Sequence, residues 1–149
     1  MTTAPQPQRP LSQKLGIKLG YQILVLNAPP SYLQSLEPLP DGVIVATEMG
    51  DPPDQTFDLV QAFVEDVAAV NTIGAIAYKS LKPGGLLWFT YPKKTSRIKT
   101  DINRDVGWDL LTHHGYGPVA QIAIDETWSA LRFRSVEDIG KSAKDRLDA

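Results

Sequence analysis

The sequence predicts an α/β fold, with a mainly parallel twisted sheet of about six strands, helices on both faces and an antiparallel hairpin at the C-terminal end. Several short, almost continuously apolar runs are typical of parallel strands that are covered on both faces. The longest helix-periodic stretch lies between two of these runs, as a crossover connection requires. The last two runs are separated by only a few polar residues, which favours a hairpin over a crossover helix.

The predicted strands follow one another between clear turn signals. Four parallel strands are expected at residues 21–26, 43–47, 57–64 and 86–91, and the hairpin strands are expected at residues 119–124 and 128–133. Clusters of proline and glycine separate them, including a Lys-Pro-Gly-Gly turn before the fourth strand. We expect the penultimate strand to run parallel to the first four.

The most regular helix is expected at residues 66–81, where apolar residues recur at helical spacing. Asp66 suits its positive N-terminal end, and Lys82 suits its negative C-terminal end. The interior Gly74 indicates close packing on the sheet. The sequence therefore predicts that this helix is the main cover of one sheet face.

Shorter helices are expected elsewhere. One or two turns fit residues 11–15, with Ser12 as a possible cap, and a short helix is expected after the two prolines that follow the first strand. A further helix is expected at residues 102–114, with Thr100 or Asp101 as its cap.

Length and composition predict the domain organisation. The 149 residues, 42% of them hydrophobic, suit one core, which we place at residues 11–134. Residues 1–10 predict a disordered proline-rich tail, and residues 135–149 predict a charged tail or a short helix. The absence of cysteine excludes disulfides and thiolate metal sites. No secretion signal or bilayer-length apolar run occurs, so a cytoplasmic protein outside the membrane is expected.

A basic loop after the fourth strand is the strongest candidate site. In sheets of this class, ligands bind outside the carboxyl ends of the strands, where this loop begins. Its five cations, with Asp101 as the single acid, are Lys93, Lys94, Arg97, Lys99 and Arg104. They predict binding of a small anionic molecule or a partner protein, and a solvated charge run is the alternative. The sequence does not favour nucleic acid as a partner, because exposed aromatics are not interleaved with the cations and the net charge is −2.

Other polar residues are expected at the same edge. Asn27 follows the first strand, and Asp125 and Trp128 lie at the tip of the hairpin. Asp125 beside Glu126 suggests an acid/base pair and Trp128 a stacking surface, although hairpin turns and cores also use these residues.

Two further groups are weaker candidates. Asp101 and Asp105, four residues apart on the predicted helix, suit Mg²⁺ binding or general base catalysis, but also capping. The adjacent His113 and His114 are poorly spaced for chelation. No metal site is therefore expected, and no catalytic motif names a reaction.

The Leu-Lys-Pro-Gly-Gly turn at residues 81–85, the strand after it and the terminal hairpin resemble the class I methyltransferase fold, which uses S-adenosylmethionine. The match covers roughly residues 15–133, with one strand and helix of that family missing after residues 43–47. The resemblance implies that Glu48 contacts the cofactor's ribose. The family's glycine-rich turn after the first strand is replaced here by Asn27-Ala-Pro-Pro30.

The segments LNAPPSY, YPKKTSRIKTD, RDVGW and DETWSALRF resemble more closely a group of small bacterial proteins of unknown function. Three functions stay open at this point. The first is a non-catalytic or degenerate methyltransferase-like domain that binds an anionic ligand or a partner protein. The second is an active S-adenosylmethionine-dependent methyltransferase, and the third is a protein–protein interaction scaffold.

Overall fold

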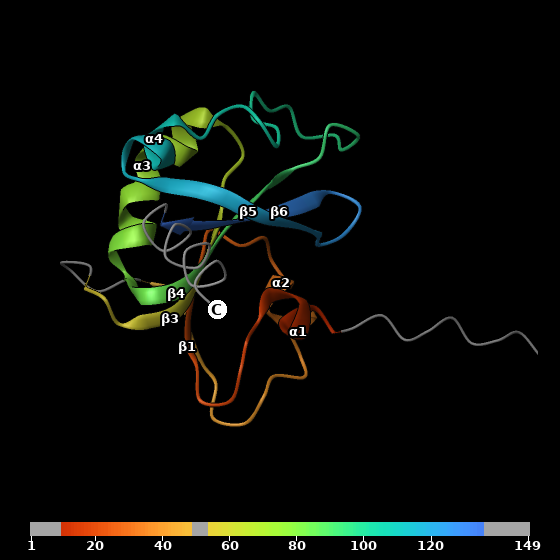
Figure 1. The fold of residues 1–149 in the computed structure, drawn as a ribbon. Helices are drawn as coiled ribbons and strands as arrows, with labels where there is room; N and C mark the ends of the chain where they lie inside the picture. The colour runs from red at the N-terminus through yellow and green to blue at the C-terminus, as the bar shows by residue number, and fades with distance from the viewer. Residues whose placement is uncertain (1–9, 49–53, 136–149) are drawn as a thin grey trace, which may run out of the picture.

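The computed structural model describes residues 10–48 and 54–135, which form the six strands and four helices of Figure 1. In chain order these are α1 (Leu11–Leu15), β1 (Gln22–Leu26), α2 (Tyr32–Ser35), β2 (Ile44–Ala46), β3 (Phe57–Phe63), α3 (Val67–Lys79), β4 (Leu81–Pro92), α4 (Asp109–His113), β5 (Tyr116–Ala123) and β6 (Trp128–Ser135). The predicted tails lie outside the described residues, except for Pro10 and Ser135.

The strands form one mixed sheet in the order β2-β1-β3-β4-β6-β5. The pairs β1–β2, β1–β3 and β3–β4 are parallel, whereas β4–β6 and β5–β6 are antiparallel. Because β5 is antiparallel to β6, it runs in the direction of β4, as the sequence predicts. The strand order reverses at β1, so the carboxyl ends of β1 and β3 flank the position where ligands bind in such sheets.

Alternate side chains of the central strands supply two separate cores. Leu87 and Phe89 of β4 belong to the core under α3 and α4, and Trp88 belongs to the core under α1 and α2. Figure 1 shows the two helix pairs on opposite sides of the strands. The indole N–H of Trp88 also donates to the Leu15 carbonyl oxygen at 3.0 Å, which attaches α1 to the sheet. Near-continuous apolar composition in β4 is therefore explained by cover on both faces.

The predicted helix around Gly74 is confirmed as α3. Asp66 is its N-cap, and the carboxylate accepts a hydrogen bond from the Ala69 amide at 2.8 Å. A Cβ at Gly74 would lie 2.4 Å from Leu110 Cδ2, so the close contact is with α4 and not, as the sequence analysis expects, with the sheet.

The predicted turn at residues 82–85 is instead an irregularity inside β4. Leu81 pairs with Phe57 and Leu86 pairs with Leu59, so β4 carries extra residues at this point. The strand begins earlier because the Phe57 amide donates to the Ser80 carbonyl oxygen at 3.0 Å, which extends the ladder past the turn. Lys82 consequently pairs with Asp58 at 3.1 Å and does not lie at the end of α3.

The predicted helix at residues 102–114 is wrong apart from α4. Asn103 Oδ1 accepts from the amides of Asp105 and Val106 at 2.8 and 2.9 Å, which makes a turn that competes with helix formation. Gly107 then adopts a φ of 108°. Asp101 and Asp105 therefore share no helical face, and the Asp101 carboxylate instead accepts from the Val67 amide at the start of α3.

The start of the first helix also differs from the sequence prediction. Pro10 occupies the N-cap position of α1, and Ser12 lies inside the helix. The Ser12 hydroxyl donates to the Pro38 carbonyl oxygen at 3.2 Å, so it holds α1 to the segment after α2.

The irregularity in β4 leads to a stability prediction. A Cβ at Gly85 would lie 2.9 Å from the Asp58 carbonyl oxygen, whereas a Cβ at Gly84 meets nothing within 4 Å. We expect Gly85→Ala to lower the free energy of unfolding by about 2 kcal/mol or more, because backbone must move. Gly84→Asn is the control, with a loss below about 1 kcal/mol, since asparagine tolerates the left-handed φ of 77°. Urea unfolding measures both, and equal losses would contradict the assigned packing.

Candidate ligand-binding edge of the sheet

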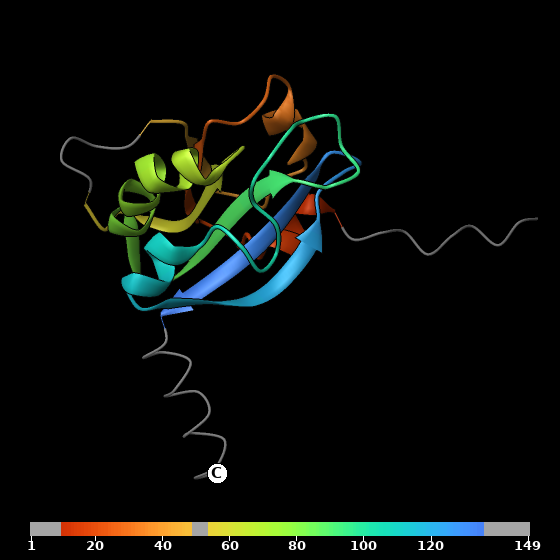
Figure 2. The same ribbon diagram turned by 90° about the horizontal axis from the view of Figure 1, so that it is seen from above.

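The carboxyl ends of the parallel strands meet at one edge of the molecule. Asn27 follows β1, Glu65 and Asp66 follow β3, and Lys93 follows β4. Figure 2 shows the loop after β4 (green to teal), the tip of the β5–β6 hairpin (blue) and α2 (orange) at the same end of the sheet. This is the edge at which the sequence predicts a ligand.

Two clefts flank the turn between β1 and α2. One, of about 520 Å³, is lined by Asn27, Pro29, Phe63 and Trp128 together with the acids at the start of α3. The other, of about 430 Å³, is more apolar and extends towards Thr47 beyond β2. The turn itself therefore separates two concave surfaces.

The backbone of this turn is unusual. Asn27 and Ser31 have φ values of 59° and 72°, in the left-handed region that non-glycine residues seldom adopt. Pro29 and Pro30 lie between them and have no amide hydrogen. The turn thus adopts backbone angles that glycines usually supply, and it has fewer backbone N–H donors than a glycine-rich turn of the same length.

A buried polar network lies beneath the turn. The Tyr32 hydroxyl donates to Gln61 Oε1 at 2.7 Å, and Gln61 Nε2 donates to Thr90 Oγ1 at 2.8 Å. Gln61 and Thr90 are both 0% exposed. Burial raises the pKa of Tyr32, the hydrogen bond to Gln61 opposes this rise, and the Asp125 charge adds to it. The phenol therefore stays a neutral donor that joins α2 to β3 and β4.

Trp128 and Asp125 have partly structural positions. Phe63 lies between Tyr32 and Trp128, with ring centroids 4.6 and 5.1 Å apart in edge-to-face arrangement. Trp128 is 8% exposed, so it belongs to the core while lining the larger cleft. The Asp125 carboxylate accepts from the amides of Thr127 and Trp128 at 2.8 and 2.9 Å, which fixes the hairpin tip.

Three of the predicted cations line one cleft on the other side of β4. Lys93, Lys94 and Arg104 surround a space of about 300 Å³ whose lining also includes Tyr91 and Ser129. We call this space the basic cleft. The Lys93 amide donates to the Thr127 carbonyl oxygen at 2.8 Å, so the start of the loop is fixed to the hairpin.

The remaining predicted residues lie apart from the basic cleft. Arg97 and Lys99 line an adjoining concavity of about 570 Å³, which shares Lys94 with it. Asn27 and Trp128 line the cleft beside the β1 turn, and Glu48 is exposed beyond the end of β2. The structure therefore divides the predicted site residues between separate concave surfaces.

Several polar residues of the basic cleft are absent from the sequence-based candidates. Gln121 Nε2 donates to the Tyr91 hydroxyl at 2.9 Å, and both residues line the cleft with Asn103 and Ser129. Burial raises the pKa of Tyr91, although the nearby Arg104 charge opposes this rise. Tyr91, Gln121 and Ser129 lie within apolar predicted strands, and only the predicted antiparallel pairing of the final strands gives a signal for them. Asn103 lies in the loop after β4, where the sequence analysis selects charged residues.

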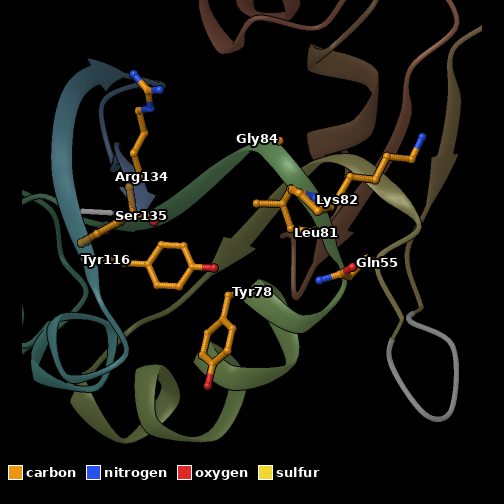
Figure 3. Close-up of a pocket in the computed structure, with 11 residues that line it drawn as sticks. Gln55, Tyr78, Leu81, Lys82, Gly84, Tyr116, Arg134 and Ser135 are labelled. Carbon is orange, nitrogen blue, oxygen red and sulfur yellow. The ribbon is translucent and has the colours of Figure 1, made fainter. Parts of the chain in front are cut away.

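A further pocket lies at the opposite edge, near the start of β4. It measures about 260 Å³ and is bounded by the irregular segment of β4, by Tyr78 and Tyr116, and by Arg134. The two tyrosine rings are 5.4 Å apart. Figure 3 shows the Arg134 and Lys82 side chains extending to different sides, so their charges do not converge. This pocket is remote from the carboxyl ends of the parallel strands β1, β3 and β4.

The described residues 10–48 and 54–135 hold no group of three or more His, Cys, Asp or Glu side chains placed to bind a metal ion. His113 and His114 are exposed at the end of α4, and the His114 ring lies 5.2 Å from that of Tyr78. Within the same part of the chain, no helix has the length and apolar character needed to cross a membrane.

Comparison with known proteins gives a likeness of fold. The chain matches no protein-family model and no curated protein sequence. Among solved structures, it is similar to a SAM-dependent methyltransferase from Aquifex aeolicus (TM-score 0.51, 14% identity, 81% of this chain and 85% of that chain). It is also similar to DhpI in complex with SAH (TM-score 0.56, 13% identity, 85% of this chain and 82% of that chain). A third similar structure is a possible exported protein from Bordetella parapertussis (TM-score 0.58, 11% identity, 83% of this chain and 65% of that chain). The chain therefore has a methyltransferase-like fold.

The network beneath the β1 turn gives a prediction for stability. Tyr32→Phe and Gln61→Leu should each lower the free energy of unfolding by about 1–3 kcal/mol, because each leaves a buried polar partner unsatisfied. The double variant should lose less than the sum of the two, since the shared hydrogen bond is counted once. Denaturant unfolding of all four proteins measures this coupling, with Tyr21→Phe as a control. Strict additivity would show that the bond contributes nothing.

Proposed function

We propose that this chain is a non-catalytic or degenerate methyltransferase-like domain that binds a small anionic ligand in the basic cleft. The observation that carries the proposal is the convergence of Lys93, Lys94 and Arg104 on one cleft, in which Asp105 is the only acid among the described lining residues. A partner protein with an acidic surface is the alternative occupant of this side of the molecule.

The cleft has the physical features of an anion site. Cations gathered on a concave surface raise the local concentration of anions more than the same charges on a flat surface. The guanidinium of Arg104 offers forked donors, and the two lysines offer compact charges that adapt to the ligand. A fixed loop start reduces the entropy lost when these side chains become ordered, since the Lys93 amide is already bonded to the hairpin.

The fold also implies S-adenosylmethionine, held by the turn after the first strand. Pro29 and Pro30 supply no amide donors to this turn, and the Tyr32 amide donates internally to the Pro29 carbonyl oxygen at 3.2 Å. Glu48 is exposed after the end of β2. The described lining of the nearby cleft includes its neighbour Thr47 but not Glu48 itself. These residues do not fit the cofactor in the manner that the resemblance implies, which favours a binding function without methyl transfer.

Charge reversal tests the basic cleft. We expect titration calorimetry with citrate, ATP and inorganic phosphate to detect binding of at least one of them, and the Lys93→Glu/Lys94→Glu variant to weaken that binding tenfold or more. Arg97→Glu/Lys99→Glu makes the same change of charge in the adjoining concavity and should have a much smaller effect. Unchanged affinity in the first variant, or equal losses in both, would remove the basis for a site at this cleft.

An active S-adenosylmethionine-dependent methyltransferase is the second candidate, because clefts of about 520 and 430 Å³ flank the turn at which a cofactor would lie. Our proposal predicts no saturable calorimetric binding of S-adenosylmethionine or S-adenosylhomocysteine. The second candidate predicts binding that Glu48→Ala weakens and that the exposed control Glu37→Ala leaves unchanged. Such binding would favour methyl transfer over the proposed function.

A further inference from the structure

We propose that the basic cleft recognises a terminal phosphoryl group, as in a phosphomonoester, and that the hydroxyls of Tyr91 and Ser129 are its neutral donors. This inference rests on the proposed function, since it names the chemical class of ligand for the same cleft. It adds two hydroxyl groups, those of Tyr91 and Ser129, to the cations that the sequence predicts, and we call these two side chains the floor of the cleft.

The two hydroxyls are placed together by strand pairing. Tyr91 of β4 and Ser129 of β6 are directly opposite each other in the antiparallel register, so their side chains lie on the same face of the sheet. Both residues line the basic cleft, although Tyr91 is only 4% and Ser129 only 7% exposed. The sheet therefore holds two nearly buried hydroxyl side chains at the floor of a cationic cleft.

Neither hydroxyl donates its proton to a described residue. Tyr91 accepts from Gln121 Nε2 at 2.9 Å, and no described residue accepts the phenolic proton. The Ser129 hydroxyl has no side-chain hydrogen bond in the same part of the chain. Because both residues line the basic cleft, each hydroxyl can donate its proton to an acceptor supplied by a ligand. Burial raises the pKa of Tyr91 and thus favours its protonated, donating form.

Charge and acceptor number distinguish a phosphoryl group from a carboxylate. Three cations, Lys93, Lys94 and Arg104, with one acid, Asp105, leave a formal net charge of +2 in the lining. A phosphomonoester carries a charge of about −1.5 to −2 at neutral pH and has three strong acceptor oxygens. A carboxylate carries a single charge on two oxygens, so it matches fewer of the ammonium, guanidinium and hydroxyl donors.

Matched probes test the inference on the full chain. Phenyl phosphate, benzenesulfonate and benzoate share a ring and differ in the anion, and titration calorimetry measures their affinities. We expect phenyl phosphate to bind at least tenfold more tightly than the other two. Tyr91→Phe and Ser129→Ala should each weaken its binding about tenfold, the loss typical of a hydrogen bond to a charged group. Tyr78→Phe, which removes a hydroxyl at the opposite edge, should leave the affinity unchanged.

The possible results separate this inference from the proposed function. Equal binding of all three probes that is lost in Lys93→Glu/Lys94→Glu would overturn phosphoryl recognition and retain a general anion site. Probe binding that the charge reversal does not alter would overturn both. Circular dichroism and thermal unfolding check that each variant is folded. Gln121→Leu, in the exposed strand β5, is a second test, because it removes the hydrogen bond to the Tyr91 hydroxyl. We expect it to weaken phenyl phosphate binding, and unchanged binding would count against a role for the Tyr91 hydroxyl.

Discussion

The double cover of β4 is the constraint on which this structure depends. Its parallel pairing with β3 and antiparallel pairing with β6 make it the join between the two parts of the sheet. Side chains on one face pack under α3 and α4, and those on the other pack under α1 and α2. A polar or smaller residue at Phe89 would leave a cavity in a close-packed core, since this side chain is 0% exposed.

The same strand organises the candidate site. Pro92 with Trp128 is the last pair of the β4–β6 register, and the bond from the Lys93 amide to the Thr127 carbonyl oxygen then holds the chain along the hairpin. The loop then returns through the Asn103 turn, which places Arg104 at the cleft that Lys93 and Lys94 also line. Cations that are spread over a long loop in sequence are thus gathered by two backbone constraints.

The sequence predicts much of the fold because its strands and α3 carry strong, local apolar patterns. The irregularity in β4 is not predictable in this way, because Gly84 and Gly85 signal a turn while pairing with β3 continues the strand. The helix predicted at residues 102–114 does not form before α4 for a similar, local reason. The Asn103 side chain accepts a hydrogen bond from a backbone amide and so favours a turn over a helix. The basic loop is visible in the sequence, whereas the cleft floor depends on the register of Tyr91 and Ser129, which are far apart along the chain.

The alternation of side chains in β4 has a consequence for communication between the clefts. Thr90 contacts Gln61, and through it Tyr32 beneath the β1 turn, while the neighbouring Tyr91 faces the basic cleft. Adjacent residues of one strand therefore belong to two different surfaces. The peptide unit between Thr90 and Tyr91 is therefore shared by the buried network beneath the β1 turn and by the lining of the basic cleft, so a substitution that shifts this backbone alters both.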